Sequence, residues 1–121
     1  MKHQELTGKI IECAFKVHRN LGFGFLESVY RNALMIELAK VGLVTEMEKN
    51  LQVHYDGQMI GDFIADVIVE NKIILELKCI KQINPVHEAQ LVNYLKATGI
   101  EVGLLINFGE KLEIKRKVLD R

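Results

Sequence analysis

The chain has 121 residues, of which 49% are hydrophobic and 26% charged, a composition typical of one globular domain spanning residues 1–121. Its formal net charge is zero, which excludes a strongly basic nucleic-acid binder and requires any phosphate-binding surface to be a local patch. The N-terminal residues do not form a signal peptide and no apolar run is long enough to span a membrane, so we expect a cytoplasmic protein without a membrane partner.

Two helices are predicted to come first. Apolar residues at helical spacing predict an amphipathic helix over residues 4–21. A second helix is predicted over residues 26–40, because Gly42 supplies the glycine that ends many helices. Its apolar side is expected to carry Leu26, Tyr30, Ala33, Leu34 and Val41. Glu37 lies on the same side and is expected to pair with a lysine.

A strand and a turn are predicted next. Residues 50–56 alternate apolar and polar side chains, which is typical of a half-buried strand. Asp56 and Gly57 form a strong turn signal at its end. The following strand is expected to start near Gln58, and Gly61 within it indicates a bulge or a bend.

The centre of the chain, residues 62–78, contains two runs rich in isoleucine and valine. The polar residues 70–72 separate them, and this pattern predicts two strands joined by a tight hairpin. Both runs are apolar on both faces, so we expect central strands that are covered on both sides. Asp66 is expected to share a face with Ile64 and Ile68.

Three ionisable residues, Asp66, Glu76 and Lys78, interrupt these apolar strands. An unpaired buried charge costs several kcal/mol, so each of them needs a partner or a metal ion. Side chains alternate along a strand, so Glu76 and Lys78 share a face. The two carboxylates lie opposite each other if a three-residue connection pairs Val69 with Ile73. A two-residue turn would separate them unless a bulge intervened, and we predict the register that joins them.

Two adjacent carboxylates beside a lysine form a site for a hard divalent cation. Mg²⁺ binds one or two carboxylates, keeps several waters and leaves positions for substrate phosphate. Lys78 would then stabilise a developing negative charge or help to activate a water molecule. The alternative is that the carboxylates form plain salt bridges with Lys72 and Lys78 and bind no metal.

A third helix is predicted over residues 85–98, because Asn84 is a good N-cap, Pro85 is a good first helical residue and Gly99 follows the last residue. One broad face of this helix carries His87, Gln90, Leu91, Tyr94, Leu95, Ala97 and Thr98. Gln90 and Tyr94 either are satisfied polar groups at the rim of a core or line a catalytic cleft, and the resemblance described below favours the cleft. For His87 both interpretations stay open.

Two strands are expected to complete the sheet. Residues 102–108 form an apolar run that predicts a buried strand parallel to its neighbour, since a helix precedes it. The last strand should be an edge strand with Leu112 and Ile114 facing inward, and its alternation breaks after Lys115, where we expect it to leave the sheet. The densest basic cluster consists of Lys111, Lys115, Arg116, Lys117 and Arg121. We interpret this cluster as an edge that resists aggregation rather than as a phosphate-binding patch.

The order of the predicted elements is helix, helix, three strands, helix and two strands. This order predicts an α/β fold with a single mixed sheet flanked by helices. Cys13 and Cys79 are too few for a four-cysteine metal site, and we interpret them as reduced thiols of the core.

The ionisable residues of the two central strands resemble a known motif. Asp66 followed by Glu76-Leu77-Lys78 resembles the Asp…Glu-x-Lys core of the PD-(D/E)XK nuclease superfamily. The residue before the aspartate is Ala65 and not proline, which is a departure at a position that varies in the superfamily.

Two further motifs strengthen the resemblance. Residues 24–30, which read Gly-Phe-Leu-Glu-Ser-Val-Tyr with the glutamate at Glu27, resemble the signature of the GxxExxY proteins. Gln90 and Tyr94 resemble the Gln-x-x-x-Tyr element of the RecB-like branch of the same superfamily. The order of the motifs also fits, and the resemblance covers nearly all of the chain.

The resemblance implies a restriction-endonuclease-like core and a nuclease that hydrolyses phosphodiester bonds with Mg²⁺ or Mn²⁺. The metal ligands that it implies are Asp66, Glu76, Glu27 and the backbone carbonyl of Leu77. The catalytic residues that it implies are Lys78, Glu76, Asp66, Gln90 and Tyr94. Nucleic acid is the expected partner, with DNA favoured over RNA, and the small size leaves room for a homodimer or a protein partner.

Two alternatives stay open. Without the resemblance, Glu27 is explained as a first-turn acid that complements the helix dipole. The domain as a whole could also be a nuclease-derived module that binds nucleic acid or protein without cutting, and the zero net charge favours this interpretation. The presence of all three motifs argues against it.

Overall fold

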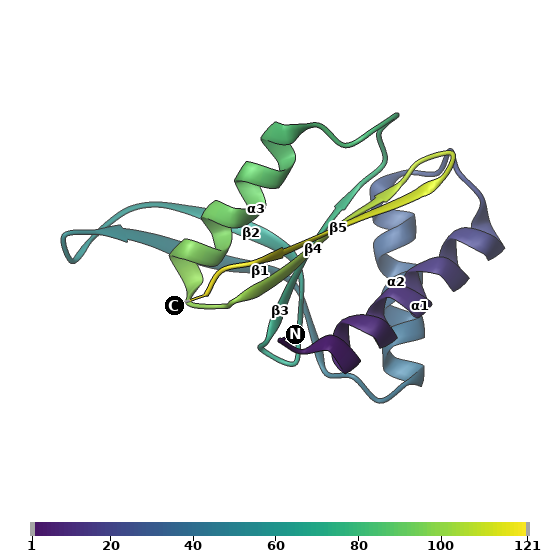
Figure 1. The fold of residues 1–121 in the computed structure, drawn as a ribbon, viewed down its shortest axis with the longest axis horizontal. Helices are drawn as coiled ribbons and strands as arrows, with labels where there is room; N and C mark the ends of the chain where they lie inside the picture. Colours follow the sequence, from purple (N-terminus) through teal and green to yellow (C-terminus); the bar gives the residue numbers. More distant parts are fainter. Residues whose placement is uncertain (1, 121) are drawn as a thin grey trace.

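The structure is a computed structural model that describes residues 2–120. Its elements are α1 (Gln4–Leu21), α2 (Glu27–Lys40), β1 (Thr45–Tyr55), β2 (Gln58–Val69), β3 (Ile73–Lys78), α3 (Pro85–Thr98), β4 (Val102–Phe108) and β5 (Leu112–Val118). The strands form one five-stranded sheet in chain order, in which β3 and β4 are parallel and the other neighbours antiparallel. Helices α1 and α2 cover one face and α3 the other (Figure 1), which confirms the predicted α/β fold with one mixed sheet.

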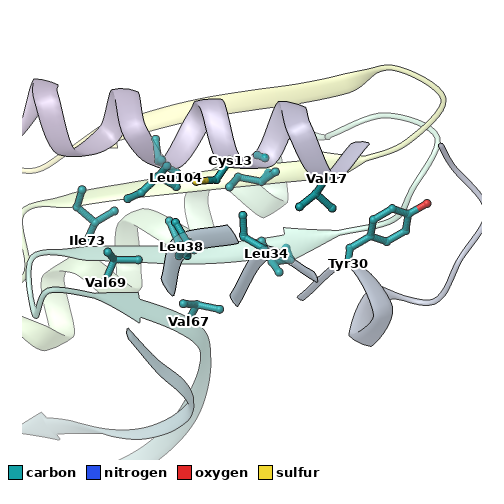
Figure 2. Close-up of a cluster of buried hydrophobic side chains, with 14 of the residues drawn as sticks. Cys13, Val17, Tyr30, Leu34, Leu38, Val67, Val69, Ile73 and Leu104 are labelled. Carbon is teal, nitrogen blue, oxygen red and sulfur yellow. The ribbon is translucent and has the colours of Figure 1, made fainter. Parts of the chain in front are cut away.

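The larger of two apolar cores lies between the sheet and the helices α1 and α2. Alternate residues of β3, Ile73, Leu75 and Leu77, are buried in it, as the period of a strand requires. Figure 2 shows side chains of both helices meeting those of the sheet, with Tyr30 at one end of the cluster and its hydroxyl directed away from the apolar residues. This core holds α2 against the sheet, and the N-terminus of α2 lies at the end of the cluster that Tyr30 occupies.

The smaller core lies under α3. Leu91 and Leu95 are one helical turn apart, and both are fully buried against Ile74 and Leu105 of the sheet. Helix and sheet approach closely at Gly103, where an added Cβ would lie 2.7 Å from Cδ1 of Leu91. A side chain at this position of β4 would therefore have to displace the side chain of Leu91 or the helix that carries it.

The start of α3 is as predicted. The Asn84 side chain accepts the N–H of Val86 at 2.8 Å, and Nδ1 of His87 accepts the N–H of Asn84 at 3.3 Å. Together these bonds form a capping box, in which each side chain satisfies a backbone donor that the helix leaves free. The sequence left open whether His87 is structural or catalytic, and the structure gives it a structural role in this cap.

The hairpin of β1 and β2 is longer than predicted. Strand β1 starts at Thr45, whereas the sequence placed its first residue at position 50. The turn at Asp56 and Gly57 is confirmed, with φ of 54° and 75°, and the register shifts by one residue next to Gly61, as expected of a bulge. The outer half of the hairpin extends beyond the rest of the sheet (Figure 1). As a result Ile64 is 57% exposed, and the prediction that the strand is covered on both faces is wrong there.

Two other predictions also need correction. Strand β5 does not leave the sheet after Lys115, because its pairing with β4 continues to Val118 opposite Val102. Leu26 and Val41, predicted for the apolar side of the second helix, flank α2 and are exposed, and the buried residues of this helix are Tyr30, Leu34 and Leu38.

Several smaller expectations can be compared with the structure. Glu37 pairs with Lys16 and Lys40, as predicted, and both cysteines are free thiols. In the basic cluster of β5, Lys117 pairs with Glu88, while Arg121 lies outside the described residues. Among residues 2–120, no helix is long and apolar enough to cross a membrane.

Candidate active site

The two central carboxylates meet where β2 and β3 separate. The register of the two strands pairs Val69 with Ile73 and Val67 with Leu75, so the three-residue connection is confirmed and the next opposed positions are Asp66 and Glu76. At these positions, hydrogen bonds from backbone N–H groups to carboxylate side chains replace the backbone–backbone hydrogen bonds between the strands. The N–H of Asp66 donates to Oε2 of Glu76 at 3.0 Å, and the N–H of Leu77 donates to Oδ2 of Asp66 at 2.8 Å. The separation of the strands therefore creates a gap that the two carboxylates fill.

An irregularity in the hairpin accompanies this separation. Ala65 and Ile68 both pack under α3, although strict alternation would place them on opposite faces of β2. In β1, Glu48 lies opposite Asp66 in the register of the two strands. Its φ is 53°, a left-handed conformation that is uncommon for glutamate. The strand thus changes its alternation at Asp66, and the backbone groups released there bond to carboxylates.

Burial and mutual repulsion make these carboxylates unusually basic. Burial, followed by the negative charge of Asp66, raises the pKa of Glu76 to about 7. Burial also raises the pKa of Asp66, although the N–H of Leu77 and the charge of Lys78 act in the opposite direction. The folded site therefore disfavours the simultaneous ionisation of both carboxylates.

Glu27 adds a third carboxylate from a different element. It is the first residue of α2 and is partly buried. Burial and the negative charge of Asp66 raise its pKa, while Lys78 lowers it, so Glu27 lies within electrostatic reach of the central pair. We call Glu27, Asp66 and Glu76 the carboxylate cluster.

The cluster is open rather than a closed cage. Among residues 2–120, no group of three or more His, Cys, Asp and Glu side chains is arranged to hold a metal ion. The structure thus places Asp66 and Glu76 next to each other and Glu27 farther away. The metal-binding role of Glu27 stays a prediction.

Lys78 is the last residue of β3 and lies on the same face as Glu76, two residues earlier. Its charge lowers the pKa of Glu27, Asp66 and Glu76, so it lies near all three carboxylates. Among the described residues, no ion pair joins Asp66 or Glu76 to a lysine. The carboxylates therefore do not form the plain salt bridges that the alternative required.

Tyr94 and Gln90 lie differently on α3. The ring of Tyr94 is partly buried and stacks on Phe63 of β2, with centroids 3.8 Å apart and planes at 8°. Burial, then the charges of Glu76 and Asp66, raise the pKa of Tyr94, which places its hydroxyl on the side of the carboxylates. Gln90, one turn earlier, is exposed at the rim. Tyr94 therefore lies within electrostatic reach of the central carboxylates, and the role of Gln90 stays a prediction.

Arg31 is a residue of this region that the sequence analysis missed. It lies one turn after Glu27 on α2, forms an ion pair with Glu48 at 2.9 Å and lowers the pKa of both Glu27 and Asp66. Its Nε is buried without a hydrogen-bond partner within the described part of the chain. The spacing of four residues from Glu27 was the available signal, since such residues are neighbours on a helix.

Comparisons with known proteins identify a family and a similar fold. The sequence model of the PD-(D/E)XK nuclease superfamily matches residues 4–117. The crystal structure of SSO0001 is similar in fold, with a TM-score of 0.58 and 23% sequence identity over 78% of this chain and 52% of that chain. The present chain thus spans about half the length of that protein. A search of curated proteins finds no match.

Proposed function

Because the chain belongs to the PD-(D/E)XK nuclease superfamily, we propose that it is a divalent-metal-dependent nuclease that hydrolyses phosphodiester bonds at the carboxylate cluster. The observation that carries this proposal is the pair of Asp66 and Glu76 at the gap between β2 and β3, with Lys78 on the same face as Glu76. We also assign the chain to the GxxExxY proteins and to the RecB-like branch, on residues 24–30 and the Gln-x-x-x-Tyr element.

The donor set fits Mg²⁺ or Mn²⁺. Each hydrogen bond in the gap uses one oxygen of its carboxylate, so the second oxygens of Asp66 and Glu76 stay outside these two bonds. Mg²⁺ needs one or two carboxylates and completes its shell with waters and substrate oxygens, so a pair is sufficient. When bound, the ion would polarise the scissile phosphate and lower the pKa of an attacking water.

Two further groups would complete the site. The N–H and C=O of one residue leave an extended strand on the same edge, so the Leu77 carbonyl, like its N–H, belongs to the edge of β3 that faces Asp66. Glu27 lies farther away and would reach the ion through a water molecule. This assignment agrees with its partial burial and with its coupling to Asp66.

The remaining residues act on substrate and water. Lys78 would hold the attacking water or stabilise the negative charge that develops on the phosphate. Tyr94, fixed by its stack on Phe63, would offer a hydroxyl beside the central carboxylates. Gln90, at the exposed rim, would contact the substrate strand rather than the reacting atoms.

A second function is favoured by one observation. Each central carboxylate accepts a backbone N–H, so Asp66 and Glu76 also have a structural use that does not require catalysis. A nuclease-derived module that binds nucleic acid or protein without cutting would keep these bonds. The two functions differ in whether a metal-dependent product forms.

Cleavage assays on labelled nucleic acid separate the two functions. The full chain is incubated with single- and double-stranded DNA, then RNA, in EDTA, Mg²⁺ or Mn²⁺. We expect cleavage in the metal ions, and a loss of about 100-fold or more in Glu76→Gln and in Lys78→Met. Lys72→Met, in the exposed turn after β2, is the matched control and should cut like the wild type. Binding without cleavage under every metal condition would favour the binding module.

A further inference from the structure

The loop between α1 and α2 exposes apolar side chains beside the candidate active site. Within residues 22–26, Phe23 is 62% exposed, Phe25 49% and Leu26 76%. The next residue is Glu27, a member of the carboxylate cluster. Exposed aromatic rings in a loop that leads directly into a reaction centre are well placed to contact the substrate.

Tyr30 holds this loop in a fixed shape. Its ring is fully buried and stacks on Phe108, with centroids 4.7 Å apart. Its hydroxyl donates to the carbonyl of Gly22 at 2.7 Å and accepts the N–H of Phe25 at 3.4 Å. Gly22 and Gly24 have φ of 71° and 108°, conformations that favour glycine. The exposed rings are therefore presented by an anchored loop, which lowers the entropy lost when a ligand binds to them.

A hollow of about 460 Å³ lies between this loop and the segments that follow β3 and β4. Phe23 and Phe25 line one side of it. Its charged lining residues are one base, Lys81, and one acid, Glu110, so their charges offset each other. Cys79, which also lines the hollow, directly follows Lys78, so the hollow lies at the end of β3 that carries the candidate catalytic lysine. Its volume lies in the range of small-molecule sites.

We propose that residues 22–26 form a stacking platform for unpaired bases of a single-stranded nucleic-acid substrate, whose adjoining phosphodiester lies at the carboxylate cluster. This inference rests on the proposed function. Aromatic rings stack on bases of any sequence, whereas a duplex keeps the faces of its bases inside the helix. A hollow with offsetting charges suits an uncharged base better than a phosphate. The zero net charge agrees with affinity that comes from stacking more than from a basic surface.

A fluorescent reporter can test the platform directly. The chain contains no tryptophan, so Phe23→Trp introduces a single one. We expect its emission to be quenched by a single-stranded oligonucleotide, in EDTA and in Mg²⁺, and much less by a duplex of the same sequence. Phe15→Trp, at a position on α1 that is 50% exposed, is the matched control and should respond to neither. Equal responses to single strand and duplex would overturn the proposal.

Truncation supplies the second test. Phe23→Ala should weaken binding of a labelled single strand by about fivefold to 100-fold, the range expected for one lost base stack, whereas Phe15→Ala should bind like the wild type. If Phe23→Ala binds and cuts like the wild type, the platform is wrong and the nuclease proposal stands. If the wild type neither binds nor cuts any nucleic acid, both fail. Unchanged binding with an altered sedimentation coefficient would instead assign the loop to self-association.

Discussion

Glu76 is the residue whose ionisation should be most visible in the stability of the protein. Its pKa is raised from 4.5 to about 7, mainly by burial, so between these values the folded state binds more protons than the unfolded state. Stability in EDTA should therefore fall as the pH rises through this window, by about 2 kcal/mol between pH 5.5 and pH 8. Urea denaturation at the two pH values measures the change.

The variant Glu76→Gln isolates this contribution. An amide keeps an oxygen for the N–H of Asp66 but carries no charge. The stability of the variant should therefore not fall between pH 5.5 and pH 8, and at pH 8 in EDTA the variant should be more stable than the wild type. Glu46→Gln, at an exposed site of β1, should keep the wild-type dependence. If the stability of Glu76→Gln depends on pH as that of the wild type does, the pKa of Glu76 is not raised in the folded state and the explanation is wrong.

At the scale of elements, the start of α2 depends on one hydroxyl. Tyr30→Phe keeps the stack on Phe108 and removes the bonds to Gly22 and Phe25. We expect a loss of about 1–2 kcal/mol in the free energy of unfolding, because backbone groups lose a partner. Thermal or urea unfolding gives this value. Tyr55→Phe, at a site that is 70% exposed, should have no effect, and equal stability of both variants would contradict the anchoring role.

The contact between α3 and β4 makes a second prediction at this scale. In Gly103→Ala the new methyl group would lie 2.7 Å from a buried leucine side chain, so we expect a cost of about 1–3 kcal/mol. Gly8→Ala is the matched control, because no atom lies within 4 Å of its added Cβ and alanine favours a helix, so it should stabilise α1 by up to about 1 kcal/mol. Urea unfolding compares the two. A neutral Gly103→Ala would contradict tight packing of Leu91 against β4.

At the scale of the whole molecule, the sequence predicted what local patterns determine. The N-cap at Asn84 and the turn at Asp56 and Gly57 follow from the conformational preferences of these residues. The register that joins Asp66 to Glu76 follows from the length of one connection. Local signals were therefore sufficient for the element order and for the centre of the candidate site.

What the sequence did not predict depends on contacts between distant elements. The exposure of Ile64 depends on how far the β1–β2 hairpin extends beyond α3, and the length of β5 depends on the length of β4. The spacing of Arg31 from Glu27 was a local signal, but the ion pair of Arg31 with Glu48 depends on how α2 packs beside β1. Gln90 and Tyr94 share a helix face, yet only the packing under α3 shows that Tyr94 is partly buried while Gln90 is exposed.

The most direct test of the account is whether the central carboxylates bind a divalent ion. Calorimetric titration of the full chain with Mn²⁺ should reveal one site in the wild type. In Asp66→Asn the site should be lost or weakened by about tenfold or more, whereas Asp62→Asn, at an exposed position of β2, should bind like the wild type. Equal binding by wild type and Asp66→Asn, or no binding by the wild type at millimolar Mn²⁺, would contradict the account and leave the carboxylates with their structural role.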